Sequence, residues 1–105
     1  MTIDEIVQEA RVAAVKATAL HIEKYGEADA CGFAWVTVEE KGSTKLGKAL
    51  LKAGFRKEYG GGLMWWNPSD SYTQSITAKE EGAIAAAKVL KLRLNVPVYS
   101  SSRMD

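Results

Sequence analysis

An apolar stripe at helical spacing fills the first quarter of the chain, and it constrains the fold more than any other feature. Apolar residues recur every three or four positions from Ile3 to Leu20. Thr2 and Glu5 form a capping-box signature before the stripe, and Gly26 follows it as a C-terminal stop. A helix of this length reaches roughly 35 Å, which is long for the single domain that 105 residues allow. Its alanine-rich surface predicts dimerisation through this helix.

Four segments carry the alternation or turn signals of β-strands. Residues 30–38 alternate between an aromatic face and a face of small or branched side chains, which suits a central strand. Segments 55–59 and 63–66 are predicted to form a hairpin, because the three glycines at 60–62 permit the positive φ angles of a tight turn. A last strand is predicted at 96–99, and the polar tail after it is expected to fray.

Two further helices complete the predicted order. A short helix runs from a Ser43 or Thr44 cap to about Ala53, and a longer one follows a second capping box formed by Thr77 and Glu80. The resulting order is α-β-α-β-β-α-β over residues 1–105. It predicts a single α+β domain, in which a small antiparallel or mixed four-stranded sheet packs with a long N-terminal helix and two further helices.

Composition excludes several classes of function. The net charge of +1 argues against a protein that binds nucleic acid over its whole surface. No segment has the length and hydropathy of a membrane span, so a cytoplasmic location is expected. One cysteine, Cys31, and one histidine, His21, predict no internal disulfide, metal centre or cofactor site, and Cys31 is expected to be buried. No catalytic motif stands out, which favours binding without turnover.

The segment from Lys41 to Tyr72 concentrates groups that can hold a phosphate-bearing base. It opens with six cationic side chains and no acid, and continues with the glycine run, two adjacent tryptophans and an Asn-Pro-Ser turn. Lys45 and its neighbours on the short helix either direct charge at phosphates or form a solvated face. Asn67 either reads the edge of a base or starts the turn before Pro68. Arg56 lies beside these groups in the sequence.

The adjacent tryptophans point to opposite faces if they lie on one strand. Only one of Trp65 and Trp66 can then pack in the core, and the other can stack on a base, an interaction worth about 1–3 kcal/mol. Phe55 is a second candidate for stacking. At the end of the chain, Arg103 and Asp105 could grip phosphate and hydroxyl groups if the tail is ordered.

Several short motifs together resemble a family of small phage proteins. They are Cys31-Gly-Phe-Ala-Trp-Val, Gly42-Ser-Thr-Lys-Leu-Gly-Lys, Ala53-Gly-Phe-Arg-Lys, Trp66-Asn-Pro-Ser, Glu81-Gly-Ala and Ser102-Arg-Met-Asp, and the likeness covers most of residues 30 to 105. The family is similar to the first type of Thoeris anti-defence sponge, which sequesters the cyclic ADP-ribose signal of bacterial TIR-domain immunity without degrading it. The resemblance implies a dimer-based assembly with a ligand pocket between protomers, and it assigns ligand-gripping roles to Arg103 and Asp105.

The leading hypothesis is therefore a phage sponge for a cyclic ADP-ribose isomer, with cyclic oligonucleotides as a second class of ligand, acting in the host cytoplasm. Its expected ligand-binding residues are Phe55, Arg56, Trp66, Asn67, Arg103, Asp105 and Lys45. An alternative is a phage protein that inhibits a host protein through its aromatic patch. A nucleic-acid binder that uses the basic helix, and a nucleotide-processing enzyme, are two weaker alternatives.

Overall fold

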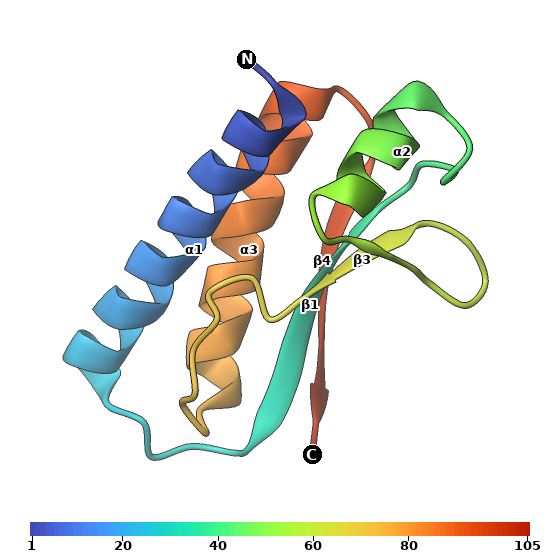
Figure 1. Ribbon diagram of the computed structural model, residues 1–105. Helices are drawn as coiled ribbons and strands as arrows, with labels where there is room; N and C mark the ends of the chain where they lie inside the picture. Colours follow the sequence, from blue (N-terminus) through green and yellow to red (C-terminus); the bar gives the residue numbers. More distant parts are fainter.

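The computed structural model describes residues 1–105, and it has one layer of helices against one sheet (Figure 1). The helices are α1 (Ile3–Tyr25), α2 (Lys45–Lys52) and α3 (Ile76–Leu94), and the strands are β1 (Gly32–Val38), β2 (Arg56–Lys57), β3 (Leu63–Trp66) and β4 (Val98–Met104). The sheet is antiparallel throughout, in the order β2-β3-β1-β4. The predicted α+β class and element order are confirmed.

The two long helices lie side by side because small residues line their contact. Ala10 and Ala14 of α1 and Ala86 of α3 are fully buried, and Ala83 of α3 is 1% exposed. Where α1 crosses α3, the hydroxyl of Thr18 donates a hydrogen bond of 2.8 Å to the Ala78 carbonyl. The alanine-rich pattern of α1 therefore serves a contact within the chain. Whether α1 also joins a second copy stays a prediction.

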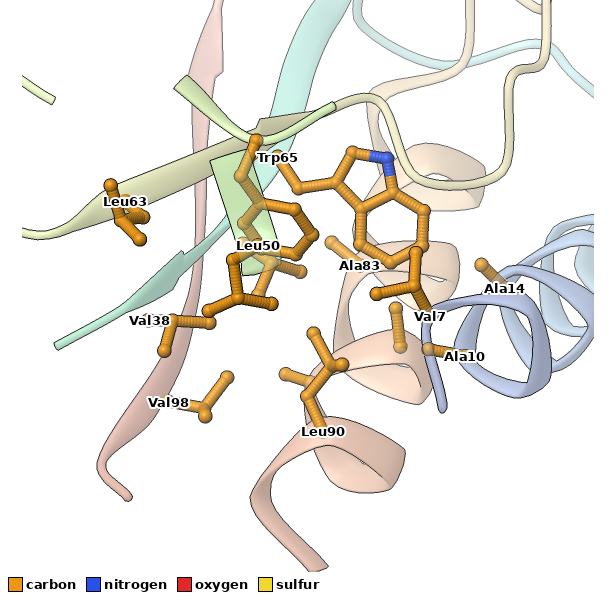
Figure 2. Close-up of a cluster of buried hydrophobic side chains, with 14 of the residues drawn as sticks. Val7, Ala10, Ala14, Val38, Leu50, Leu63, Trp65, Ala83, Leu90 and Val98 are labelled. Atoms are coloured by element: carbon orange, nitrogen blue, oxygen red, sulfur yellow. The ribbon is translucent and has the colours of Figure 1, made fainter. Parts of the chain in front are cut away.

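The core lies between the helix layer and one face of the sheet (Figure 2). Alternate residues of β1 point into it, and Leu63 and Trp65 of β3 do the same. Leu50 of α2 and Leu90 of α3 close it from the helix side. The buried cluster comprises Ile6, Val7, Ala10, Ala14, Ala34, Val36, Val38, Leu50, Phe55, Leu63, Trp65, Ala83, Ala86, Ala87, Leu90 and Val98. The opposite face of the sheet has no helix over it.

The start of α3 differs from its prediction. The helix is capped by Ser75, whose hydroxyl accepts a hydrogen bond of 3.1 Å from the Ala78 amide, so Thr77 and Glu80 do not form a capping box. The Ile76 amide donates to the Ala30 carbonyl at 2.9 Å, which anchors the chain beside β1 immediately before the helix. This tertiary contact makes the helix begin earlier than the local pattern indicates.

The last strand is longer than predicted, and it includes the tail. β4 runs from Val98 to Met104 and pairs with the whole of β1, from Val38↔Val98 to Gly32↔Met104. Polar serines have little preference for strands, but the backbone of the central strand β1 needs a partner on this side. The expectation of a frayed tail was wrong for this reason.

Two smaller expectations also need correction. The segment predicted as a strand at 55–59 pairs only at Arg56 and Lys57. Cys31 is exposed, because it precedes β1 at the end of the sheet, where its backbone forms an isolated bridge to Ser75 and accepts a hydrogen bond from the Asp105 amide. No helix of the protein combines the length and hydrophobicity that a bilayer crossing demands.

Candidate functional site

The uncovered side of the sheet carries a continuous group of aromatic side chains, which we call the aromatic face. It is defined by the residues that alternate away from the core, namely Phe33, Trp35, Thr37, Arg56, Met64, Trp66, Tyr99, Ser101 and Arg103. The register places Trp35 between Trp66 of β3 and Ser101 of β4. Five large apolar or aromatic side chains of three strands thus lie on this side without a helix to cover them.

Trp66 is the exposed member of the tryptophan pair. Its side chain is 45% exposed on the aromatic face, whereas Trp65 is 8% exposed and packs in the core against Phe55, with ring centroids 5.4 Å apart. Trp66 stacks on Trp35 with centroids 5.4 Å apart and ring planes inclined by 13°. Phe33 flanks it at 5.3 Å. The three rings form a platform of the kind that holds a flat base.

Two cationic side chains lie at the Phe33 end of this platform. The Arg103 guanidinium sits 6.0 Å from the centroid of the Phe33 ring, and the Lys79 ammonium sits 5.5 Å from it. Lys79 also donates a hydrogen bond of 3.1 Å to the Gly32 carbonyl. Neither cation forms an ion pair with a carboxylate, since the ion pair of the structure joins Arg93 to Glu9. Both charges are therefore free to meet an anion.

A small cavity opens beside the platform, between β1, the end of β3 and the loop that leads to α3. Its volume is about 200 Å³, and it is lined by Phe33, Ala34, Trp66, Asn67, Ser71, Tyr72 and Lys79. Asn67 adopts a positive φ of 49° and donates from its side-chain amide to the Ser71 carbonyl at 3.1 Å. Its side-chain oxygen is buried and accepts no hydrogen bond. It is one of two buried side-chain oxygens in the protein that have no hydrogen-bond partner, the other being the hydroxyl of Ser69.

The structure brings together four of the seven residues predicted from sequence. Trp66 and Arg103 lie on the aromatic face and Asn67 lines the cavity beside it. Asp105 is exposed next to this face, where its amide donates to the Cys31 carbonyl at 3.0 Å. Because side chains alternate along a strand, Asp105 points to the same side as Arg103.

The other three predicted residues lie apart from the platform. Arg56 is exposed on the edge strand β2, opposite Met64 and away from the cavity. Lys45 begins α2 in the helix layer, which is on the other side of the sheet. Phe55 is buried in the core, so its ring has no surface for a ligand.

Three site residues escaped sequence reasoning. The alternating pattern of β1 identified Phe33 and Trp35 as an aromatic face, but it gave no sign that no helix covers that face. Lys79 lies far from the basic segment and reaches the site from α3, which only the fold could reveal. No group of three His, Cys, Asp or Glu side chains is arranged to hold a metal ion.

Comparison with protein-family models, with curated proteins and with solved structures finds no match for this chain.

Proposed function

We propose that the protein binds and sequesters an anionic, nucleotide-derived signal on its aromatic face without changing it chemically. The observation that carries the proposal is the Trp35–Trp66 stack with Phe33 beside it, next to the unpaired charges of Arg103 and Lys79. A base can lie on the rings, and a phosphate of the same molecule can meet the cations. Asn67 lines the cavity beside the rings, and Asp105 follows Arg103 at the end of the chain.

The class of ligand that we propose is a cyclic ADP-ribose isomer. Such a molecule combines a base, ribose hydroxyls and a pyrophosphate in a compact ring, which matches the mixture of flat, acceptor and cationic groups at this site. The resemblance of the sequence motifs to those of the phage anti-defence sponges favours the same class. On this proposal the protein acts in the host cytoplasm as a sponge, and its affinity comes from stacking and charge and not from turnover.

The proposal is tested by measuring the Tm of the purified protein against cyclic ADP-ribose isomers and cyclic di- and trinucleotides. A ligand at 100 times its Kd stabilises the fold by about 2.7 kcal/mol, which for a domain of this size raises Tm by roughly 10 °C or more. Mass spectrometry of the released ligand then shows whether it is intact. A cyclic ADP-ribose isomer recovered unchanged supports the sponge.

Two other results would count against the proposal. A ligand converted with time would indicate an enzyme. A panel without any shift would favour the alternative, in which the exposed aromatic face binds a host protein. Arg103→Ala, with Arg93→Ala as the matched control on α3, links a positive shift to the site, because only the first variant removes a charge from the aromatic face.

A further inference from the structure

One edge of the sheet is long and unpaired. The Glu39 amide donates to the Pro97 carbonyl at 2.9 Å and the Asp105 amide donates to the Cys31 carbonyl at 3.0 Å, which fixes the phase of the ladder between β1 and β4. Odd-numbered residues of β4 therefore direct their backbone groups at β1. The N–H and C=O groups of Val98, Ser100, Ser102 and Met104 point outward, and no strand lies beyond them (Figure 1).

Arg103 is the one charged residue of β4, and the other features that protect an edge from a second strand are absent. Natural edge strands are usually short, bulged, or interrupted by lysine or proline. β4 has seven residues, of which six are exposed, and it contains no lysine or proline from Val98 to Met104. The opposite edge is different, because β2 has only two residues, both cationic, and a glycine loop follows it. An unprotected edge of this length is a template for backbone pairing.

The sequence of β4 is complementary to itself. An antiparallel pair centred on Ser101 places Ser100 opposite the second copy's Ser102, and Tyr99 opposite the second copy's Arg103. Val98 then faces the second copy's Met104, so apolar meets apolar and a cation meets an aromatic ring. The same register pairs all outward backbone groups in up to about eight hydrogen bonds. We propose that two copies of the chain join through β4 in this register and form a continuous eight-stranded sheet.

The helix layer is compatible with the same two-fold axis. A groove between α3 and β4 is lined by Glu80, Glu81, Ile84, Ser100, Ser101 and Ser102, and Ile84 is 40% exposed there. Glu81, Ile84 and Lys88 are exposed on one side of α3, at positions i, i+3 and i+7. Antiparallel packing around Ile84 puts Glu81 beside the second copy's Lys88.

The distance between the two α3 helices in the proposed dimer is also compatible with helix packing. Each α3 packs over β1 and β4 of its own chain. The two α3 helices are then separated by two strand spacings, about 9.6 Å, which is within the usual 8–10 Å between packed helices. The two chains can therefore form the backbone ladder and the helix contact together.

This pairing extends the aromatic face across the two copies. The second copy's Tyr99 lies next to Arg103 on the aromatic face. The two Ser101 side chains, which are small, lie between the two Trp35 rings. The cavity of one protomer, about 200 Å³, is smaller than the roughly 300–1,000 Å³ of most ligand pockets. The cavity lies on the β3 side of β1, so the second copy, which joins beyond β4, adds its Tyr99 to the other side of the platform. This role of Tyr99 rests on the proposed function, whereas the pairing itself does not.

Cross-linking at the axis tests the register. At a non-hydrogen-bonded antiparallel pair the two Cα atoms are about 4.5 Å apart, which lies within the range that a disulfide spans. In a Cys31→Ser background, Ser101→Cys should therefore form a covalent dimer under mild oxidation in the absence of ligand. Ser43→Cys in the same background is the control, because Ser43 is exposed in the loop before α2 and lies outside β4. Equal cross-linking of both variants, or none at Ser101→Cys, overturns the register.

Sedimentation of the unliganded protein tests the edge itself. Ser100→Pro removes an outward N–H without touching the ladder to β1, and it should raise the dimer Kd by at least about tenfold. Ser100→Ala keeps the N–H and should sediment like the wild type. The proposal is overturned if the wild type stays monomeric at high micromolar concentration. It is also overturned if Ser100→Pro still forms the dimer, and that result would favour dimerisation through α1. A dimer that binds no nucleotide contradicts only the proposed function.

Discussion

Trp65 and Trp66 are neighbours in the sequence, but β3 sends them to opposite sides of the sheet. Trp65 fills the core between Phe55 and α1, where the Arg11 guanidinium lies 5.3 Å from its ring centroid. Trp66 instead contributes to the aromatic face. The same residue type therefore stabilises the fold at one position and offers a surface to a ligand at the next.

Alanine substitution should separate these two roles. Trp66→Ala removes a stacking surface worth about 1–3 kcal/mol, so the affinity for a bound cyclic nucleotide should fall about 5- to 150-fold while urea unfolding changes little. Trp65→Ala removes a buried ring and should cost about 3–5 kcal/mol of unfolding free energy. Calorimetry and urea denaturation of both variants measure the two effects. A large loss of stability in Trp66→Ala, with unchanged affinity, would contradict the assignment.

Asp29 links the loop before β1 to the start of α3 and should make stability depend on pH. Hydrogen bonds from Thr77, and then from Ser75, lower the pKa of the Asp29 carboxyl below its ordinary value. Because the folded state favours the ionised form, the stabilisation is present above the unfolded pKa and is lost as the pH falls through the lowered folded pKa. Asp29→Asn should thus be less stable than the wild type at neutral pH.

The measurement is urea unfolding of both proteins across acidic pH. The difference between wild type and Asp29→Asn should shrink as the pH falls below the ordinary range of aspartate. Thr77→Val, which removes one hydroxyl partner, should reduce the same pH dependence. A difference that stays constant down to the lowest pH would show that the carboxylate charge is not the cause.

At the scale of the elements, the crossing of α1 and α3 depends on a glycine in the interior of a helix. A methyl group at Gly82 would lie 3.1 Å from the Ser69 side chain and 3.2 Å from the Ala14 carbonyl, and it would also collide with the Thr18 hydroxyl. Thr18 cannot move freely, because its hydroxyl bonds the Ala78 carbonyl. The close approach of the two helices thus requires the absence of a side chain.

Gly82→Ala should therefore destabilise the protein, although alanine favours an isolated helix by about 1 kcal/mol over glycine. We expect the overpacked contact to cost about 1–3 kcal/mol, measured as a lower midpoint of urea unfolding. Ala85→Gly on the same helix is the control, since Ala85 is only partly buried. An increase in stability for Gly82→Ala would show that the helices separate at little cost.

The elements were predictable from sequence where local signals decide them, and not where tertiary contacts do. Period-3.6 and period-2 patterns identified the helices and β1, and the Thr2–Glu5 capping box forms as predicted. The Ser75 cap and the full length of β4 depend on backbone pairing with residues 30–38, which no local sequence window around them contains. The prediction of the site residues failed for the same reason. Lys79 reaches the site from α3, which is distant in the sequence, and Phe55 has an aromatic ring but is buried in the core.

At the scale of the whole molecule, a single layer of helices leaves one face and one edge of the sheet without partners. The exposed Trp66 and the half-buried Phe33 on the face, and the outward N–H and C=O groups on the edge, are both costly in isolation. A ligand on the face and a second copy on the edge would satisfy them together. One two-fold axis is compatible with both the self-complementary sequence of β4 and the contact between the two α3 helices through Glu81, Ile84 and Lys88.

Exchange of charges on α3 tests whether the two layers share that axis. Glu81→Lys and Lys88→Glu each place like charges opposite one another in the proposed dimer, so each single variant should raise the dimer Kd, and more strongly at low salt. The double variant restores opposite charges and should dimerise like the wild type, whereas two unrelated surface effects would add. Sedimentation of all four proteins at two salt concentrations decides between these outcomes. Because such a rescue requires Glu81 to meet Lys88 of another chain, it would place the helices, and with them the edge strands, around a single two-fold axis.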